Sequence, residues 1–133
     1  PPARTYVYLI YGMYHCLNIV TEQEGFPAAV LIRGIYQIIP DLYDLDGPGK
    51  VCRAFGITRH HNNKSVIDPV PDSLAIFESN LSLQWQATPR IGIRIGTDKL
   101  WRYVITDKEK KHMRERLEES HISQLFLPCV PRK

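Results

Sequence analysis

The sequence has few cysteines, and their number and spacing exclude two common kinds of site. Cys16, Cys52 and Cys129 form an odd set, and no pair has the CxxC spacing of a redox or zinc motif. Such a set builds no disulfide framework and supplies no zinc ligands at a familiar spacing. We therefore expect a reducing intracellular compartment and no bound metal.

Long apolar runs and a strong charge excess are also lacking. No apolar run approaches the roughly 18 residues that a membrane-spanning helix needs, and no charged leader precedes a short apolar segment. The net charge is only +3, so only the local placement of basic residues can argue for nucleic acid. The 133 residues, 44% of them hydrophobic, suffice for one domain without membrane contact.

The first third of the chain has the pattern of an antiparallel sheet. Aromatic and β-branched residues on both sides of Tyr11-Gly12-Met13 predict a hairpin with this turn, and a continuous apolar strand is expected over 28–35. Residues 41–47 are acidic and predict a loop. Residues 50–55 predict a short helix that Gly56 closes.

The remainder predicts short strands and one charged helix. Strands are expected over 74–78, 81–85, 89–96 and 100–105, and the Thr106-Asp-Lys-Glu109 spacing of a capping box predicts a helix to about Ser120. In 89–96 the alternation assigns the isoleucines to one face and Arg90, Gly92 and Arg94 to the other. The predicted fold is α+β, a single domain on a curved, mostly antiparallel sheet (a roll or partly open barrel) with few short helices.

Four tyrosines, Tyr6, Tyr8, Tyr11 and Tyr14, fall within nine residues of the predicted hairpin. One interpretation is that all of them pack a sheet face with their hydroxyls in solvent. The other is that the turn at Gly12 separates a ring that lines a pocket, Tyr8, from a ring that projects as a wedge, Tyr11. Composition leaves both open.

Two polar residues stand inside predicted strands. Asn18 is unusual there, and a buried amide without partners costs about 1–3 kcal/mol, so it is either satisfied structurally or directed at a ligand. Arg33 is flanked by apolar and small residues. It needs an anionic or carbonyl partner if it is buried, or it extends from the strand end to water.

Basic residues elsewhere suggest contacts to phosphate. Lys50 follows a Gly-Pro-Gly turn before a helix, which is not a P-loop because the spacing GxxxxGK fails. Arg90 and Arg94 flank Gly92, an arrangement that suits a sugar-phosphate backbone, although solvated charges at a sheet edge are an ordinary alternative. His60 and His61 we interpret as part of a solvated loop.

The run YVYLIYGMYHCLN, residues 6–18, closely resembles the signature hairpin of the alkyladenine (3-methyladenine) DNA glycosylases, a family of base-excision repair enzymes. The resemblance continues through 29–33, 47–54, 89–93 and 101–103. It covers roughly residues 5–105, and the charged residues 106–133 have no match. We expect a glycosylase-like domain over 1–105 and a helical tail over 106–133.

The resemblance implies a monofunctional, monomeric purine DNA glycosylase that needs no cofactor. It would bind double-stranded DNA in the minor groove, flip an alkylated or deaminated purine out of the helix, and hydrolyse its N-glycosidic bond. Tyr11 matches the intercalating tyrosine, Tyr8 the ring on which the flipped base stacks, and Asn18 the amide that disfavours normal guanine. Arg33 and the main chain of Ile91 match groups near the attacking water. Met13, Lys50, Arg90, Gly92 and Arg94 are expected at the DNA backbone.

One part of the family pattern has no match in this chain. The glutamate that activates water lies, in the family, N-terminal to the tyrosine hairpin, whereas here the sequence starts at Pro1, so we expect a chain shortened at its N-terminus. Glu22 and Glu24 follow the hairpin and do not match this base. The alternatives are a noncatalytic DNA-binding relic of the family and a generic β-rich module. The expected location is intracellular, in the nucleus of a eukaryote or the cytoplasm and nucleoid of a bacterium.

Overall fold

The fold is α+β, as predicted, with antiparallel strands and short helices. A computed structural model describes residues 1–37, 43–80 and 82–120. These residues form two compact units, the first within residues 1–78 and the second within residues 79–123. The described strands belong to three small sheets, of which two are in the first unit and one in the second.

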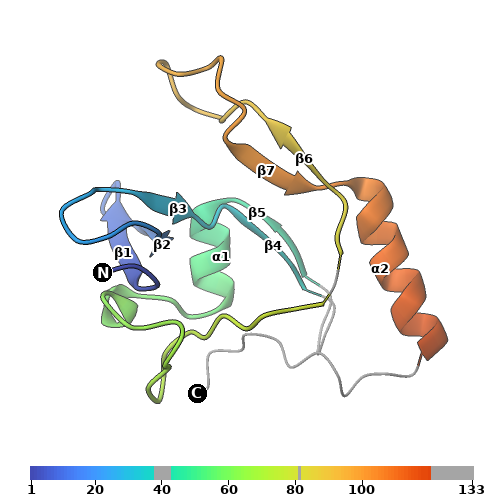
Figure 1. Ribbon diagram of the computed structural model, residues 1–133, viewed down its shortest axis with the longest axis horizontal. Coiled ribbons are helices and arrows are strands. Elements are labelled where there is room, and N and C mark those ends of the chain that lie inside the picture. The colour runs from blue at the N-terminus through green and yellow to red at the C-terminus, as the bar shows by residue number, and fades with distance from the viewer. Residues whose placement is uncertain (38–42, 81, 121–133) are drawn as a thin grey trace. The chain divides into compact units, whose positions relative to one another are not determined.

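The first unit is built on a three-stranded antiparallel sheet in the order β1-β2-β3, comprising β1 (Thr5–Ile10), β2 (Tyr14–Val20) and β3 (Ala29–Leu31) (Figure 1). The predicted turn between β1 and β2 is confirmed. Tyr11 and Gly12 have φ values of +53° and +67°, and the Met13 amide donates to the Ile10 carbonyl at 3.2 Å. Two successive positive φ values define a type I′ turn, whose twist matches that of the paired strands.

The predicted strand over 28–35 is in fact two strands. The chain leaves the first sheet at Ile32 and Arg33, and β4 (Gly34–Gln37) then pairs with β5 (Tyr43–Asp46). A Cβ on Gly34 would lie 2.7 Å from the Leu45 carbonyl oxygen, so only glycine permits this close approach. The loop predicted over 41–47 is wrong for Tyr43–Asp46, because pairing with β4 outweighs the low strand preference of aspartate.

The predicted helix after the Gly-Pro-Gly turn is α1 (Pro48–Ala54). It begins earlier than expected because proline is well suited to the first helical position. At its end Gly56 has φ +63°, the Ile57 amide donates to Cys52 O at 2.8 Å, and the Gly56 amide donates to Arg53 O at 3.4 Å. This is a Schellman cap, so the predicted closure at Gly56 is confirmed. The helix contacts β2, β4 and β5.

The polar loop that we predicted to be solvated is tied to the outer edge of β1. It contains the 3-10 helix η1 (Arg59–His61). The Val7 amide donates to Asn62 Oδ1 at 2.8 Å, and Arg4 Nε donates to Asn63 Oδ1 at 2.7 Å. The Asn62 side chain and main-chain hydrogen bonds of Thr5 with Asn63 and Lys64 occupy groups of β1 that would otherwise form a free strand edge.

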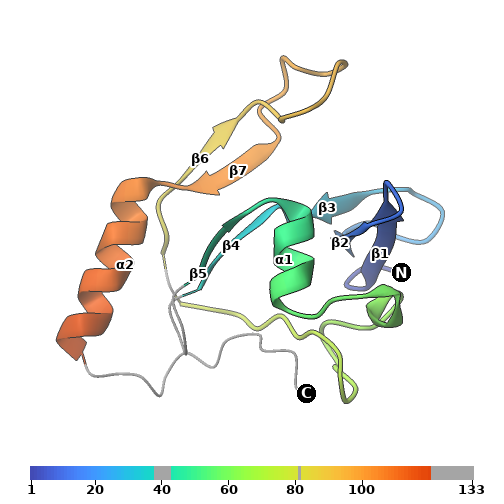
Figure 2. The same cartoon turned by 180° about the vertical axis from the view of Figure 1, so that it is seen from behind.

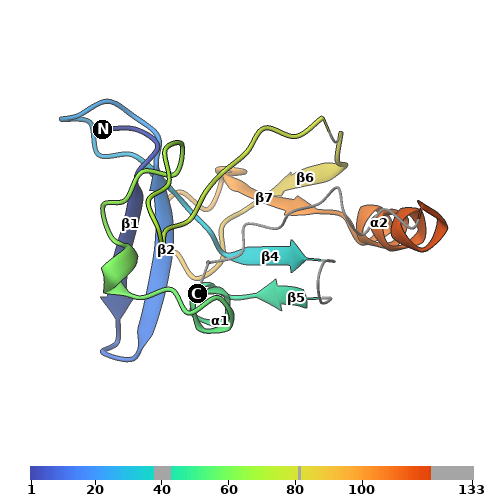
Figure 3. The same cartoon turned by 90° about the horizontal axis from the view of Figure 1, so that it is seen from below.

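The core of the first unit lies between the sheet and α1. Val7, Leu17, Cys52 and Ile57 form a buried cluster there. Figure 3 shows β1 and β2 side by side, and separately β4 beside β5. Since Val7 and Leu17 are opposite each other in the β1–β2 register, they share one face of the hairpin, and this face packs on the core.

The second unit is a hairpin followed by a helix. It contains β6 (Trp85–Thr88), β7 (Arg102–Ile105) and α2 (Asp107–Ser120). Figure 2 shows the loop between β6 and β7 at the end of the hairpin opposite α2. The Glu109 amide donates to Thr106 Oγ1 at 3.1 Å, which confirms one half of the predicted capping box. The Thr106 amide donates to the Gln84 carbonyl at 3.3 Å and not to Glu109. Buried Glu109 also pairs with Arg116 at 2.7 Å.

Three predicted strands are wrong. Residues 74–78 and 82–84 lie outside the strands, and Leu81 lies outside the described residues. Residues 89–96 alternate like a strand, but Gly92 and Gly96 have φ values of +74° and +73° and turn the backbone. The predicted assignment of two strand faces is therefore wrong for Arg90, Ile91, Gly92 and Arg94. The last predicted strand is confirmed as β7.

Candidate functional site

The hairpin face opposite Val7 and Leu17 carries a cluster of Tyr6, Tyr8, Cys16 and Asn18, of which Cys16 and Asn18 are buried. Tyr8 is opposite Cys16 in the register, and Tyr6 is opposite Asn18. Residues that face each other across an antiparallel pair, and residues two apart on one strand, share a face. The rings of Tyr6 and Tyr8 are 5.4 Å apart between centroids and tilted by 39°. The hairpin therefore brings Tyr8 and Asn18 together, as the pocket hypothesis requires.

Asn18 is buried, with 8% of its surface exposed, and its amide is satisfied within the hairpin. Its Nδ2 donates to the Tyr6 carbonyl oxygen at 3.2 Å, and its side chain also hydrogen-bonds to the Tyr8 phenol. Of the two interpretations of Asn18, the first is thus observed: partners within the hairpin satisfy the hydrogen-bonding groups of its amide. The side chain of Asn18 therefore lies next to that of Tyr8 on one face of the hairpin.

The Tyr8 phenol is half-buried and resists ionisation. Removal from water raises its pKa above the ordinary value, the neighbouring Cys16 raises this pKa further, and the hydrogen bond with Asn18 lowers it. The net direction is upward, so the phenol keeps its proton. Cys16 is therefore part of this cluster, although sequence reasoning did not single it out. The predicted turn implies a register that pairs Cys16 with Tyr8, and this pairing could have identified it.

Tyr11 and Met13 project from the hairpin tip. Tyr11 is 85% exposed and Met13 is 66% exposed. A φ of +53° is rare for a bulky side chain, and such a conformation costs about 1–3 kcal/mol. The interpretation that all four tyrosines pack one sheet face fails for Tyr11. Tyr14 has a structural role, because its ring packs against Gly49 so closely that a Cβ there would lie 3.0 Å from the ring.

Arg33 lies at the break between β3 and β4 and is half-buried. Its main-chain oxygen accepts a hydrogen bond from Gly47 N at 2.7 Å. Its Nε is buried and has no hydrogen-bond partner among the described residues. A buried donor without an acceptor costs about 1–3 kcal/mol. Arg33 is thus a half-buried cation with one buried donor that has no partner among the described residues.

The basic residues predicted at the DNA backbone lie in both units. Lys50 is exposed on α1 in the first. In the second, the Arg90 guanidinium lies over the Trp101 ring at 5.2 Å, and Lys99 Nζ lies 6.0 Å from the same ring. Arg94 is exposed, and a Cβ on Gly92 would meet nothing within 4 Å. Sequence reasoning missed Trp101 and Lys99, because the glycine turns that bring them to Arg90 disrupt the predicted strand.

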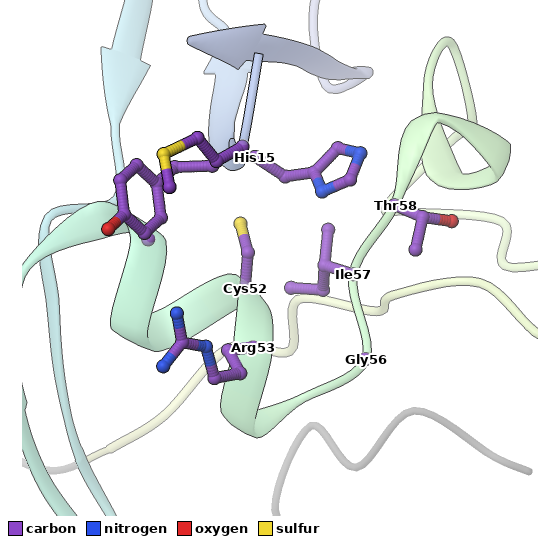
Figure 4. A pocket seen from close by; sticks show the side chains of 9 residues that line it. His15, Cys52, Arg53, Gly56, Ile57 and Thr58 are labelled. Carbon is purple, nitrogen blue, oxygen red and sulfur yellow. The ribbon is translucent and has the colours of Figure 1, made fainter. Parts of the chain in front are cut away.

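A pocket of about 280 Å³ lies beside the hairpin tip, between the start of β2, α1 and the segment after α1. His15, Arg53 and Thr58 are among the residues that line it, and Met13 lines it from the hairpin (Figure 4). The Cys52 sulfur points into it. Burial first, and Cys16 second, raise the pKa of this thiol to about 11. The thiol is therefore neutral near pH 7 and is a poor nucleophile.

Two kinds of site are not found in the part of the chain that the structure describes. Over residues 1–37, 43–80 and 82–120, no helix is long and apolar enough to cross a membrane. The same residues contain no group of three or more histidine, cysteine, aspartate or glutamate side chains arranged to hold a metal ion. Cys16 and Cys52 are free thiols, and Cys129 lies outside the described residues.

Comparison with known proteins identifies relatives in bacteria. Three proteins provisionally named 3-methyladenine DNA glycosylase are 51–54% identical to this chain. The Rickettsia felis relative is 53% identical over 107 residues, 80% of this chain and 59% of the relative. The Sodalis glossinidius relative is 54% identical over 99 residues, 74% and 57% of the two chains. The Wolbachia sp. subsp. Brugia malayi relative is 51% identical over 104 residues, 78% and 60%.

These matches leave part of each relative uncovered, because the chain spans less than two thirds of the length of these curated proteins. A family model described as methylpurine-DNA glycosylase matches residues 1–109. The match includes the tyrosine hairpin, α1 and the β6–β7 hairpin, and it ends within the first turn of α2. Both the family model and the relatives point to the same conclusion: this chain belongs to the methylpurine-DNA glycosylase family.

Proposed function

We propose that this chain forms the DNA-reading and base-binding part of a monofunctional purine DNA glycosylase. It acts on double-stranded DNA as a monomer, from the minor groove, and removes alkylated or deaminated purines. We assign residues 1–105 to the glycosylase-like domain and residues 106–133 to a tail, whose described part contains the helix α2. The protein works inside the cell. Hydrolysis uses water as the nucleophile and needs no cofactor.

The observation that carries the proposal is the conformation of Tyr11. A bulky aromatic side chain, 85% exposed, is held at the tip of a tight turn with φ +53°. The type I′ turn requires a positive φ at this position, where glycine, asparagine or aspartate is usual and a bulky aromatic residue is strained. Such strain is concentrated at functional positions. An intercalating ring has to project in this way, because it fills the space that a flipped nucleotide leaves in the base stack.

The pocket chemistry follows from the Tyr8 cluster. Alkylation leaves many purines cationic, and a cation over a tyrosine face gains about 0.5–2 kcal/mol that a neutral base does not. Asn18, next to Tyr8 on the same face, clashes with the exocyclic amino group of a normal guanine. Flipping costs a few kcal/mol and costs least where pairing is already damaged. Lesions are therefore selected both by the ease of flipping and by the fit in the pocket.

The chemical step requires a carboxylate that orients and deprotonates water. We place this glutamate in the part of the relatives that the chain does not match, and we place Arg33 and the main chain of Ile91 near the attacking water. The partnerless Nε of Arg33 supports this assignment, because it has a donor to offer to a carboxylate or to water. Met13, Lys50, Arg90, Gly92 and Arg94 contact the DNA backbone.

The test compares this chain with a chimera, the full-length Rickettsia felis relative in which the 107 matched residues are replaced by those of this chain. Both are incubated with duplexes that contain hypoxanthine or ethenoadenine, and abasic sites are measured by alkaline cleavage. Release of the base by the chimera alone is the expected result. Binding by both proteins without release, weakened by Tyr11→Ala, would instead identify a noncatalytic DNA-binding relic. If neither protein binds nor cleaves, the proposed function is wrong.

A further inference from the structure

The pocket beside the tip of the β1–β2 hairpin is lined by neutral and basic residues only. Arg53 comes from α1 and His15 from β2, and they lie on two sides of Cys52 (Figure 4). The volume, about 280 Å³, is just below the usual range for pockets that hold drug-sized molecules. It suits a smaller group, such as a phosphate with part of its sugar.

The basic side chains of the pocket are not used by the fold. Within the described residues, neither the Arg53 guanidinium nor the His15 imidazole makes a hydrogen bond or an ion pair. Arg53 is exposed and His15 is half-buried. A guanidinium at the side of a pocket with no protein partner is free to pair with an anion, and its planar set of donors matches phosphate oxygens.

Groups that would repel an anion are already neutralised or occupied. The Cys52 thiol is neutral near pH 7, since its pKa is raised to about 11. The carbonyl oxygens of Cys52 and Arg53 accept hydrogen bonds in the cap that ends α1. The Thr58 hydroxyl accepts from the His60 amide at 3.3 Å and keeps its own proton to donate. The pocket therefore presents donors rather than acceptors.

The position of the pocket connects it to residues that we placed at the DNA backbone. Met13, which lines the pocket, is two residues from Tyr11. Lys50 precedes Arg53 by three residues on α1, so the two side chains share one face of the helix. A DNA strand that contacts Tyr11 and Met13 would continue past this pocket.

We propose that this pocket binds the phosphodiester backbone of DNA, with Arg53 pairing with a phosphate and His15 donating a hydrogen bond to it. The proposal rests on the proposed function, because it assumes that the hairpin lies on DNA. It adds a contact outside the base pocket that the resemblance does not assign. Arg53 contributes affinity that is independent of sequence and depends on salt.

The test is the salt dependence of binding of this chain to an undamaged duplex, measured by fluorescence anisotropy between 50 and 200 mM NaCl at pH 8. Removing one cation that neutralises a phosphate reduces the slope of log K against log salt by about 0.9. Arg53→Gln is expected to reduce the slope by about this amount. His15→Phe is expected to weaken binding about fivefold with little change in slope, since it removes a hydrogen bond and not a charge.

Arg59→Gln is the matched control, because Arg59 is exposed on η1 and does not line the pocket. An unchanged slope in Arg53→Gln, an equal change in Arg59→Gln, or no measurable binding of the chain at 50 mM salt would each overturn the inference. Excision by the chimera is scored separately. If the chimera excises the base but Arg53→Gln leaves the slope unchanged, the proposed function stands and the pocket has no part in it. If Arg53→Gln reduces the slope but the chimera does not excise, the pocket binds DNA and the proposed function is wrong.

Discussion

The side-chain amide of Asn18 donates a hydrogen bond to the main-chain carbonyl of Tyr6 at 3.2 Å, across the β1–β2 pair. One residue thus joins the two strands of the hairpin and stands beside the Tyr8 ring. A substitution of Asn18 therefore changes the hairpin as well as the surroundings of Tyr8.

Asn18→Ala is expected to lower the free energy of unfolding by about 1–3 kcal/mol, because it removes the donor to the Tyr6 carbonyl in a buried place. Urea unfolding monitored by circular dichroism measures the loss. Asn80→Ala, at an exposed position, is the control and should change little. Equal midpoints for Asn18→Ala and the unsubstituted chain would show that the hydrogen bond contributes nothing.

Tyr11→Ala is expected to weaken binding to a lesion-containing duplex by about 5- to 150-fold, the equivalent of about 1–3 kcal/mol for one base stacked on an aromatic ring. Stability should not fall, since the ring is 85% exposed. Tyr11→Gly should be at least as stable as the unsubstituted chain, because glycine adopts φ +53° without steric cost. The control is Phe26→Ala, which removes another exposed ring. A similar loss of binding in both alanine variants would rule out a wedge role specific to Tyr11.

The free energy of unfolding is expected to fall at alkaline pH because the pKa of the Cys52 thiol is raised in the fold. Its pKa is about 11 in the fold against 9.0 for an unperturbed thiol. The raised value means that the protonated thiol stabilises the fold fully below pH 9, and this contribution disappears as the pH rises through 11. Between these limits the free energy of unfolding should fall by up to about 1.4 kcal/mol per pH unit from this group.

Cys52→Ala isolates that contribution. The variant loses packing at every pH, but the part of the alkaline decline that belongs to the thiol should vanish. The measurement is urea unfolding at several values between pH 8 and pH 11.5, with the difference between the two proteins plotted against pH. A difference that stays constant over this range would contradict the burial of the thiol in its neutral form.

Arg33→Met tests whether the buried Nε is retained for function. Methionine keeps an unbranched apolar chain and removes the donor that lacks a partner, so the thermal midpoint of the chain should stay unchanged or rise. Excision by the chimera should fall at the same time. The control is Arg59→Met at an exposed position, which should leave both quantities unchanged. A large drop in the midpoint of Arg33→Met would mean that the arginine stabilises the fold instead.

Several features follow from the amino-acid sequence alone because they depend on neighbouring residues. The turn at Tyr11-Gly12-Met13 depends on the freedom of Gly12 to adopt positive φ, and it was predicted correctly. The cap at Gly56 and the start of α2 at Thr106 depend equally on residues within one turn of a helix. The separation of Tyr8 from Tyr11 follows from the same turn. The family is recognisable because these local signals recur in order.

Tertiary structure alone decided the features that depend on distant partners. The division of 28–35 into β3 and β4 depends on the approach of Leu45 to Gly34, and the alternation in 89–96 was misleading because a strand exists only where another chain segment pairs with it. The tie between Asn62 and Val7, the neutral Cys52 thiol and the basic pocket join segments that are far apart in the chain. Local pattern determines turns and caps, whereas burial and pairing are decided only when the whole chain has folded.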